Sequence, residues 1–100
     1  MRWLSQLLFG RPRSSRWKAL RKRFIRQNPR CEACGAGNDL EAHHIFPYHL
    51  FPELELEEGN LITLCGTCHF VFGHLKDWGS YDPHVRMTAK WYRGRVDERP

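Results

Sequence analysis

The chain has 100 residues, enough for one small domain whose apolar core needs further support to be stable. Its 41% hydrophobic and 27% charged residues exclude a disordered tail, and no apolar run approaches the roughly 18 residues that cross a bilayer. The net charge of +5 is uneven, because residues 1–30 hold ten Lys and Arg and no acid, whereas residues 31–100 hold six basic and eleven acidic residues. This basic block predicts a polyanionic partner: nucleic acid first, with an anionic membrane surface as the alternative.

Residues 1–10 contain a short apolar stretch that Ser5 and Gln6 interrupt and that leads into Arg11-Pro12-Arg13. Because a small-residue cleavage site is missing there, we predict no secretion signal and a cytoplasmic location. In that compartment four cysteines are expected to bind metal rather than to form two disulfides. The membrane alternative would use the apolar side chains of this stretch, which are Leu4, Leu7, Leu8 and Phe9.

A basic helix is predicted next, with Ser14 or Ser15 as its cap and Asn28-Pro29 as its end. Its apolar residues recur at helical spacing and should form the packed face: Trp17, Leu20, Phe24 and Ile25. Its other face presents cations that we expect to bind nucleic-acid phosphates, unless they form an ordinary solvated face: Arg16, Lys18, Arg21, Lys22, Arg23 and Arg26.

Two C-x2-C pairs follow, Cys31 with Cys34 and Cys65 with Cys68, separated by thirty residues. Two such turns can bring four thiolates into one tetrahedral zinc site. Gly35 can adopt the positive φ that lets backbone amides point at the thiolates. A four-cysteine site is closed to water and substrate, so we expect it to stabilise the fold, and its loss should unfold the domain.

Between the pairs, residues 40–46 are predicted as a strand closed by Pro47, and residues 60–64 as a second strand. The connection over residues 52–59 is acidic and is expected at the surface. His43 and His44 are adjacent on the first strand, so their side chains should point to opposite faces. One can then bind a metal while the other moves a proton, as phosphodiester hydrolysis requires.

After the second pair we predict a helix from Phe70 to about Trp78, and Asp82-Pro83 has the sequence of another helix start. The apolar stripe of that last helix is formed by Val85, Ala89, Tyr92 and Val96. Helical spacing favours a core position for most aromatic residues, namely Trp17, Phe24, Phe70, Phe72, Trp78, Trp91 and Tyr92. Phe46 and Tyr48 are instead candidates to line a substrate groove.

In this order the motifs resemble the HNH endonuclease family, also called the ββα-metal nucleases. The matching residues are Cys31-x-x-Cys34, His43-His44-Ile45 with Pro47, and Asn60-Leu61-Ile62-x-Leu64-Cys65-x-x-Cys68-His69. The resemblance implies a small α+β fold: a β-hairpin plus helix, braced by a four-cysteine zinc site and flanked by N- and C-terminal helices. It divides one domain into a basic arm and helix (1–30), a nuclease core (31–78), and a C-terminal helix and tail (79–100).

The resemblance also implies a role for each matching residue. His43 and His69 would bind the catalytic ion, and His44 would be the general base that activates water. Asn60 would order the loop between the strands and help to hold the base. His74 is a further candidate ligand, although it lies about 140° around an ideal helix from His69, so it would reach the same ion only where the helix is distorted or ends.

The activity implied is a metal-dependent DNA endonuclease with a one-metal mechanism and weak sequence preference. Its cofactors would be a structural Zn²⁺ and a catalytic Mg²⁺, Mn²⁺, Ni²⁺ or Zn²⁺, with two imidazole ligands favouring a transition metal. The expected partner is double-stranded DNA, not a membrane, bound by a monomer or weak dimer. The alternative is a non-catalytic zinc module that binds nucleic acid or a protein. His49 and His84 match no role in the family.

Overall fold

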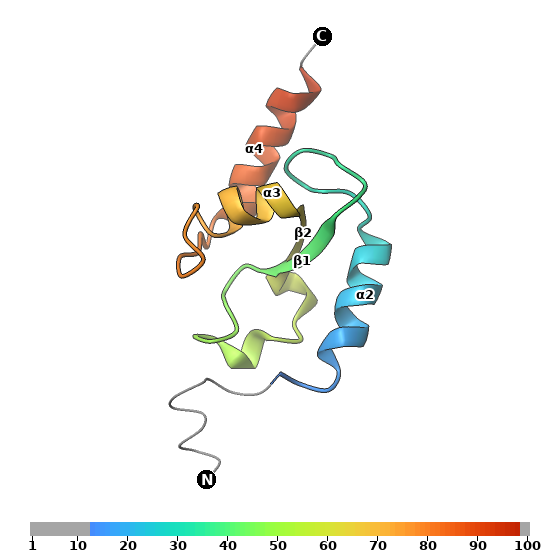
Figure 1. The fold of residues 1–100 in the computed structure, drawn as a ribbon, viewed down its shortest axis with the longest axis vertical. Coiled ribbons are helices and arrows are strands. Elements are labelled where there is room, and N and C mark those ends of the chain that lie inside the picture. Colours follow the sequence, from blue (N-terminus) through green and yellow to red (C-terminus); the bar gives the residue numbers. More distant parts are fainter. Residues whose placement is uncertain (1–12, 99–100) are drawn as a thin grey trace.

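The computed structural model describes residues 13–98. The predictions for the apolar stretch, including Leu4, Leu7, Leu8 and Phe9, therefore lie outside the described residues. The elements run in this order (Figure 1): helix α2 (Trp17–Gln27), strand β1 (Leu40–His44), short 3-10 turns η1 (Pro52–Leu54) and η2 (Glu58–Asn60), strand β2 (Leu61–Cys65), helix α3 (Gly66–Cys68), π-turn η3 (His69–Gly73) and helix α4 (Val85–Asp97). This is the small α+β architecture that the motifs predicted.

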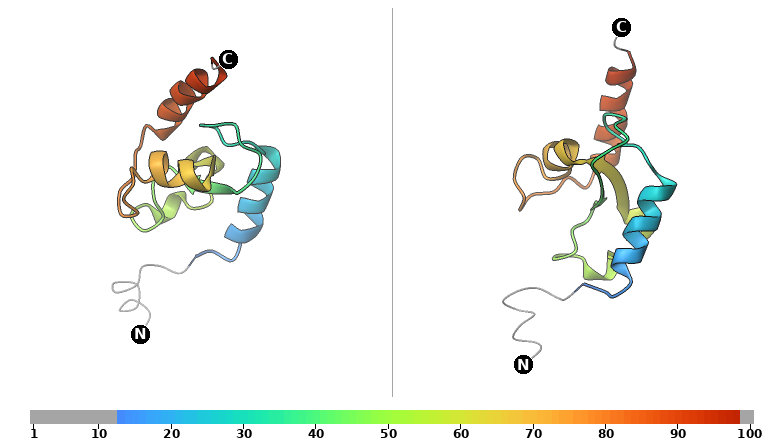
Figure 2. Two further views of the ribbon diagram at one scale, coloured as in Figure 1. Left: turned by 45° about the horizontal axis from the view of Figure 1, so that its top comes forward. Right: turned by 45° about the vertical axis from the view of Figure 1, so that its right-hand side comes forward.

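The two strands form an antiparallel hairpin at the centre of the fold, with His43 opposite Ile62 and His44 opposite Leu61. Helix α2 lies on one side of the hairpin, and α3 with η3 lies on the other (Figure 2). On the α2 side Leu61 packs with Leu20 and Phe24, while the other side holds a larger apolar cluster that includes Ile62. Both faces of the hairpin are therefore buried. Since side chains alternate along a strand, adjacent residues pack on opposite sides of it.

Helix α2 ends at Asn28 as predicted, but neither Ser14 nor Ser15 caps its start, because the N-cap residue is Arg16 and makes no side-chain cap bond. Ser14 instead forms the turn before the helix, where its Oγ accepts from Arg16 N at 3.2 Å and its carbonyl accepts from Trp17 N at 3.1 Å. At its end, the Asn28 side chain donates to the Phe24 carbonyl at 3.0 Å, ahead of Pro29. The Ser14 interactions hold the first turn next to the hairpin loop, where the site described below begins.

Helix α4 has the predicted buried stripe, but it begins at Val85 with His84 as its N-cap, two residues later than the Asp82-Pro83 start that the sequence predicts. Val85 and Ala89 are fully buried, and the Asp82 carboxylate accepts from His84 N at 2.8 Å. Trp91 on the same helix is 61% exposed, so its predicted core position is wrong. Within residues 13–98, no helix has the length and apolar character needed to cross a membrane.

The helix predicted from Phe70 to Trp78 is wrong in its extent, because helical structure ends at Gly73. Its last turn is a π-turn in which His74 N donates to the His69 carbonyl at 3.1 Å. Leu75 and Lys76 then adopt left-handed φ angles of 55° and 65°, which reverse the chain. Trp78 follows this reversal and is 61% exposed rather than part of the core.

Candidate metal centres and active site

The four cysteines form one cluster at the end of the hairpin. Their Sγ atoms all lie within 4.8 Å of one another, and none is in a disulfide. Gly35 has the expected positive φ of 84°, and Cys34 N donates to the Cys31 Sγ at 3.4 Å. Burial raises the pKa of Cys68, whereas for Cys31 backbone donors outweigh burial and lower the pKa to about 7. The cluster can therefore hold a structural metal ion on thiolate ligands.

Three histidines form a second cluster on the face of β1 that is turned toward η3. One ring nitrogen from each of His43, His69 and His74 lies within 4.8 Å of the others, and the Nε2 atoms of His69 and His74 are 3.2 Å apart. The Nε2 atom of His43 is buried without a hydrogen-bond partner. A divalent ion would satisfy this nitrogen, and imidazole nitrogens are ligands that transition metals prefer. The three histidines thus fit a metal ion.

The protonation state of His43 also suits a metal ligand. Burial, with the nearby His69 and His74, lowers the pKa of His43 to about 3, so its imidazole stays neutral. Only a neutral imidazole has a free lone pair for a metal. Burial likewise lowers the pKa of His69, even though a neighbouring carboxylate acts in the opposite direction.

The π-turn explains how His74 joins this cluster. On an ideal α-helix the side chain of His74, five residues after His69, would point away from His69. In a π-turn the backbone hydrogen bond spans five residues instead of four, so the side chain of His74 lies on the same face as that of His69. His74 is then fixed by its Nδ1 atom, which donates to the Ser80 carbonyl at 2.9 Å and leaves Nε2 facing His69. The helix is therefore distorted in the way that the sequence analysis required for His74 to reach the same ion as His69.

Glu41 is a further member of the site that the motif comparison did not find. Its carboxylate contacts the Nδ1 atom of His69, which fixes the ring so that Nε2 is directed toward His74. Carboxylates in this position orient histidine ligands and increase their basicity. Glu41 lies two residues before His43 on β1, so strand alternation alone places both on one face and could have identified it.

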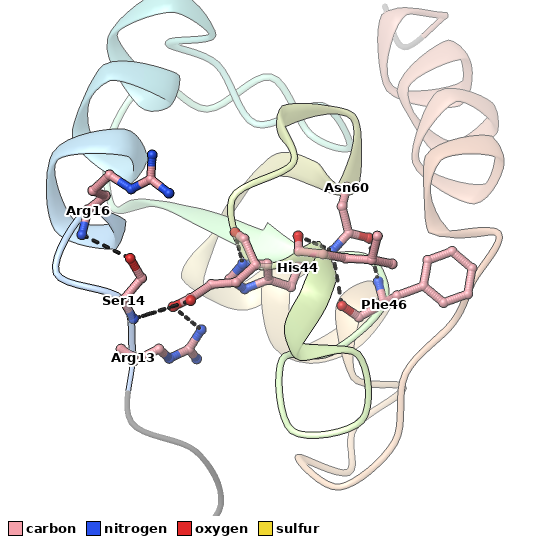
Figure 3. Close-up of polar contacts among 8 residues, drawn as sticks. Arg13, Ser14, Arg16, His44, Phe46 and Asn60 are labelled. Atoms are coloured by element: carbon pink, nitrogen blue, oxygen red, sulfur yellow. Dashed lines mark hydrogen bonds and ion pairs between the residues drawn. The ribbon is translucent and has the colours of Figure 1, made fainter.

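His44 points to the opposite face of β1, as the alternation predicted. Its ring lies against the Trp17 indole, with 4.3 Å between ring centroids, and its Nε2 atom is 2.9 Å from the backbone carbonyl of Glu55 (Figure 3). Since a carbonyl only accepts, Nε2 carries the hydrogen and Nδ1 is left as the acceptor. Burial lowers the pKa of His44, which keeps the ring neutral. Its role as general base stays a prediction.

Glu55 departs from the expected acidic surface connection, because it is 6% exposed. Its carboxylate accepts from Ser14 N at 3.1 and 3.2 Å and pairs with Arg13 at 3.9 Å. The Arg13 guanidinium also lies 4.3 Å from the centroid of the Tyr48 ring. Glu55 therefore joins the basic N-terminal segment to the loop that holds His44, a link between distant residues that no local pattern reveals.

Asn60 holds the same loop from the other end. Its Oδ1 accepts from Phe46 N at 2.9 Å, and its Nδ2 donates to the carbonyls of Phe46 at 3.1 Å and Leu54 at 3.3 Å (Figure 3). The side chain is buried, with 6% exposure. It thus ties together both arms of the loop between the strands.

A cavity of about 260 Å³ is lined by residues from both faces of β1. Its lining includes five histidines, His43, His44, His49, His69 and His74, and also Arg13, Trp17, Ala42, Pro47, Tyr48 and Trp78. Phe46 and His84 line a different cavity. The six candidate cations of α2 are all exposed, and Arg23 pairs with Glu58 at 3.2 Å.

Comparison with known proteins agrees with this geometry. Residues 31–70 match the family model described as HNH endonuclease. No curated protein and no solved structure matches the chain. The matched segment contains both cysteine pairs, both strands, and the residues His43, His44, Asn60 and His69. The family whose model matches residues 31–70 is thus the HNH endonuclease family that the motifs of this chain resemble.

Proposed function

We propose that the protein is a metal-dependent endonuclease that hydrolyses phosphodiester bonds in DNA. The observation that carries the proposal is that a three-histidine cluster and a separate histidine, whose Nε2 is bound to a backbone carbonyl so that Nδ1 is its acceptor nitrogen, line one cavity. A non-catalytic zinc module would need the four cysteines and the basic helix, but it would need neither the histidine cluster nor an oriented His44.

His43 and His69 would hold the catalytic ion, with His74 as a third ligand. Bound there, a divalent ion supplies Lewis-acid polarisation of the phosphate and stabilises the departing oxygen. Imidazole ligands favour Mn²⁺, Ni²⁺ or Zn²⁺ over Mg²⁺. Glu41 keeps His69 oriented through its Nδ1 contact.

His44 would be the general base. The Glu55 carbonyl holds the hydrogen on Nε2, so Nδ1 accepts the proton of the attacking water. The Trp17 ring covers one side of the imidazole and limits its rotation. Asn60 contributes indirectly, because it fixes the loop that carries Glu55.

The positively charged groups would bind the phosphate backbone. Arg13 lines the same cavity as the histidines and would contact a phosphate there. The exposed cations of α2, which are Arg16, Lys18, Arg21, Lys22, Arg23 and Arg26, would extend this contact along double-stranded DNA. Phosphate contacts carry no sequence information, so a weak sequence preference is expected.

The four cysteines would bind a structural Zn²⁺. Their reduced thiols suit the cytoplasm, where disulfides are rare. A monomer or weak dimer that carries one site per chain would nick one strand at a time.

The experiment is cleavage of supercoiled plasmid by zinc-loaded protein with added Mg²⁺, Mn²⁺ or Ni²⁺. Wild type should produce nicked plasmid only with added metal, and His44→Ala should not. His84→Ala is the matched control, because His84 is exposed and lies outside the histidine cavity. If wild type shifts DNA on a native gel but never cuts it, the proposal is wrong and the binding-module alternative replaces it.

A further inference from the structure

Trp78 is an exposed aromatic residue at the edge of the histidine cavity. It lines the cavity and is 61% exposed. Its ring centroid lies 5.0 Å from that of His74 and 5.5 Å from that of His69, and it also contacts Phe70 at 4.9 Å. An indole is therefore held beside two candidate metal ligands while most of its surface remains accessible.

The backbone around Trp78 holds it in this position. The left-handed residues Leu75 and Lys76 reverse the chain, and Lys76 N donates to the Phe70 carbonyl at 2.9 Å. The Asp77 carboxylate then accepts from Gly79 N and from Ser80 Oγ, each at 3.1 Å. Left-handed backbone is unfavourable for residues other than glycine, yet this loop adopts it twice. The loop thus presents a large apolar ring to solvent in a fixed orientation.

The other aromatic rings that line the cavity are already covered. The Trp17 ring lies against His44, with 4.3 Å between centroids, and the Arg13 guanidinium lies 4.3 Å from the centroid of the Tyr48 ring. Among the described aromatic residues that line this cavity, Trp78 is the most exposed. It is accordingly the one available to bind part of a substrate.

We propose that Trp78 stacks on an unpaired nucleobase next to the phosphate that is cleaved. The inference rests on the proposed nuclease function and specifies its substrate: DNA with an unpaired nucleotide at the cut site, such as a bulge, gap or flap beside a duplex. Base stacking on exposed aromatic rings is a general mode of single-strand recognition. In an intact duplex each base is covered on both faces by its neighbours, so the indole could not stack on it.

The position of Trp78 fits a nucleotide next to the cleaved phosphate. Its ring centroid lies 5.0 Å from that of His74 and 5.5 Å from that of His69, so a base stacked on the indole would lie directly beside a phosphate held at the histidine cluster. A base stacked on Trp78 therefore belongs to a nucleotide that flanks a phosphate in the cavity. The cations of α2 remain available to the adjoining duplex.

The test compares two labelled oligonucleotides of the same sequence, one fully paired and one with a single unpaired nucleotide. We expect wild type to cleave the second at least tenfold faster at the unpaired position. Trp78→Ala should reduce that preference by between about 5-fold and 150-fold, as loss of one base stack predicts, and Trp78→Phe should retain most of it. Trp91→Ala is the matched control, since Trp91 is also 61% exposed but lies on α4.

The ratio of the two cleavage rates separates this role from damage to the metal site, because weaker metal binding slows both substrates alike. Equal cleavage of both substrates by wild type, or an unchanged ratio in Trp78→Ala, overturns the inference while the nuclease function stands. Binding is measured separately with His44→Ala protein by fluorescence anisotropy. If wild type does not cleave but Trp78 still provides selective binding of the unpaired oligonucleotide, the nuclease proposal fails and the stacking role is supported.

Discussion

Replacement of Asn60 by alanine tests whether the loop between the strands depends on one buried amide. Asn60→Ala removes three hydrogen bonds, to Phe46 N, the Phe46 carbonyl and the Leu54 carbonyl. At about 1 kcal/mol each, their loss should lower the free energy of unfolding by roughly 3 kcal/mol. For a domain of this size the melting temperature should fall by roughly 12 to 24 °C.

The assay is thermal and urea unfolding of zinc-saturated protein, followed by circular dichroism. Asn28→Ala is the matched control, because that amide is half-buried and makes one such bond, to the Phe24 carbonyl at 3.0 Å. It should lower the free energy of unfolding by about 1 kcal/mol. Plasmid cleavage by Asn60→Ala should also fall at temperatures where the variant is fully folded, since the loop positions Glu55 against His44. Equal stability losses in the two variants would refute the reasoning.

Three further predictions concern the metal sites and the basic helix. Removal of zinc by a strong chelator, or Cys34→Ser, should abolish the cooperative unfolding transition in circular dichroism, because the metal stabilises a small core; a metal-free protein that still unfolds cooperatively would contradict this. Glu41→Gln should weaken Mn²⁺ or Ni²⁺ binding about 10- to 100-fold by calorimetry, whereas the exposed Glu53→Gln should not. The logarithm of DNA affinity should fall steeply with the logarithm of salt concentration, and Lys18→Ala or Lys22→Ala should each reduce that slope by about 0.9, unlike Lys90→Ala on α4; a flat slope in wild type would exclude phosphate binding by α2.

The parts of the fold that the sequence predicted are those fixed by local spacing. The two C-x2-C pairs predicted one four-cysteine cluster, and the Sγ atoms do lie together. Alternation along a strand predicted that His43 and His44 point to different faces. The structure places His43 in the three-histidine cluster and His44 against Trp17. These relations hold over a few residues and need no knowledge of distant contacts.

The features that differ from the predictions depend either on contacts between distant residues or on a local change in helical hydrogen bonding. Glu55 was expected at the surface because its neighbours are acidic, but Ser14 and Arg13 cover it from another part of the chain. Trp78 was expected in the core because helical spacing was extended past Gly73, where the π-turn ends the helix. Hydrophobic periodicity reports that a segment is helical, but it does not reveal where the hydrogen bonding changes from α to π.

The residue at position 73 gives a physical reason for the change from α-helical to π-helical hydrogen bonding after His69. On an ideal α-helix, a side chain four residues after His69 would lie on the same face as His69, and the chain has Gly73 there. A Cβ atom at this position would lie 3.0 Å from Cε1 and 3.2 Å from Nε2 of His43, so the buried His43 ring occupies the space that a side chain would need. With that space filled, a third imidazole can reach His69 only from the next residue. The π-turn supplies the extra residue in the hydrogen-bonded ring, and it thereby brings His74 Nε2 to 3.2 Å from His69 Nε2. Gly73, the π-turn and His74 are therefore best understood as one adaptation of the proposed ligand set to the ring of His43.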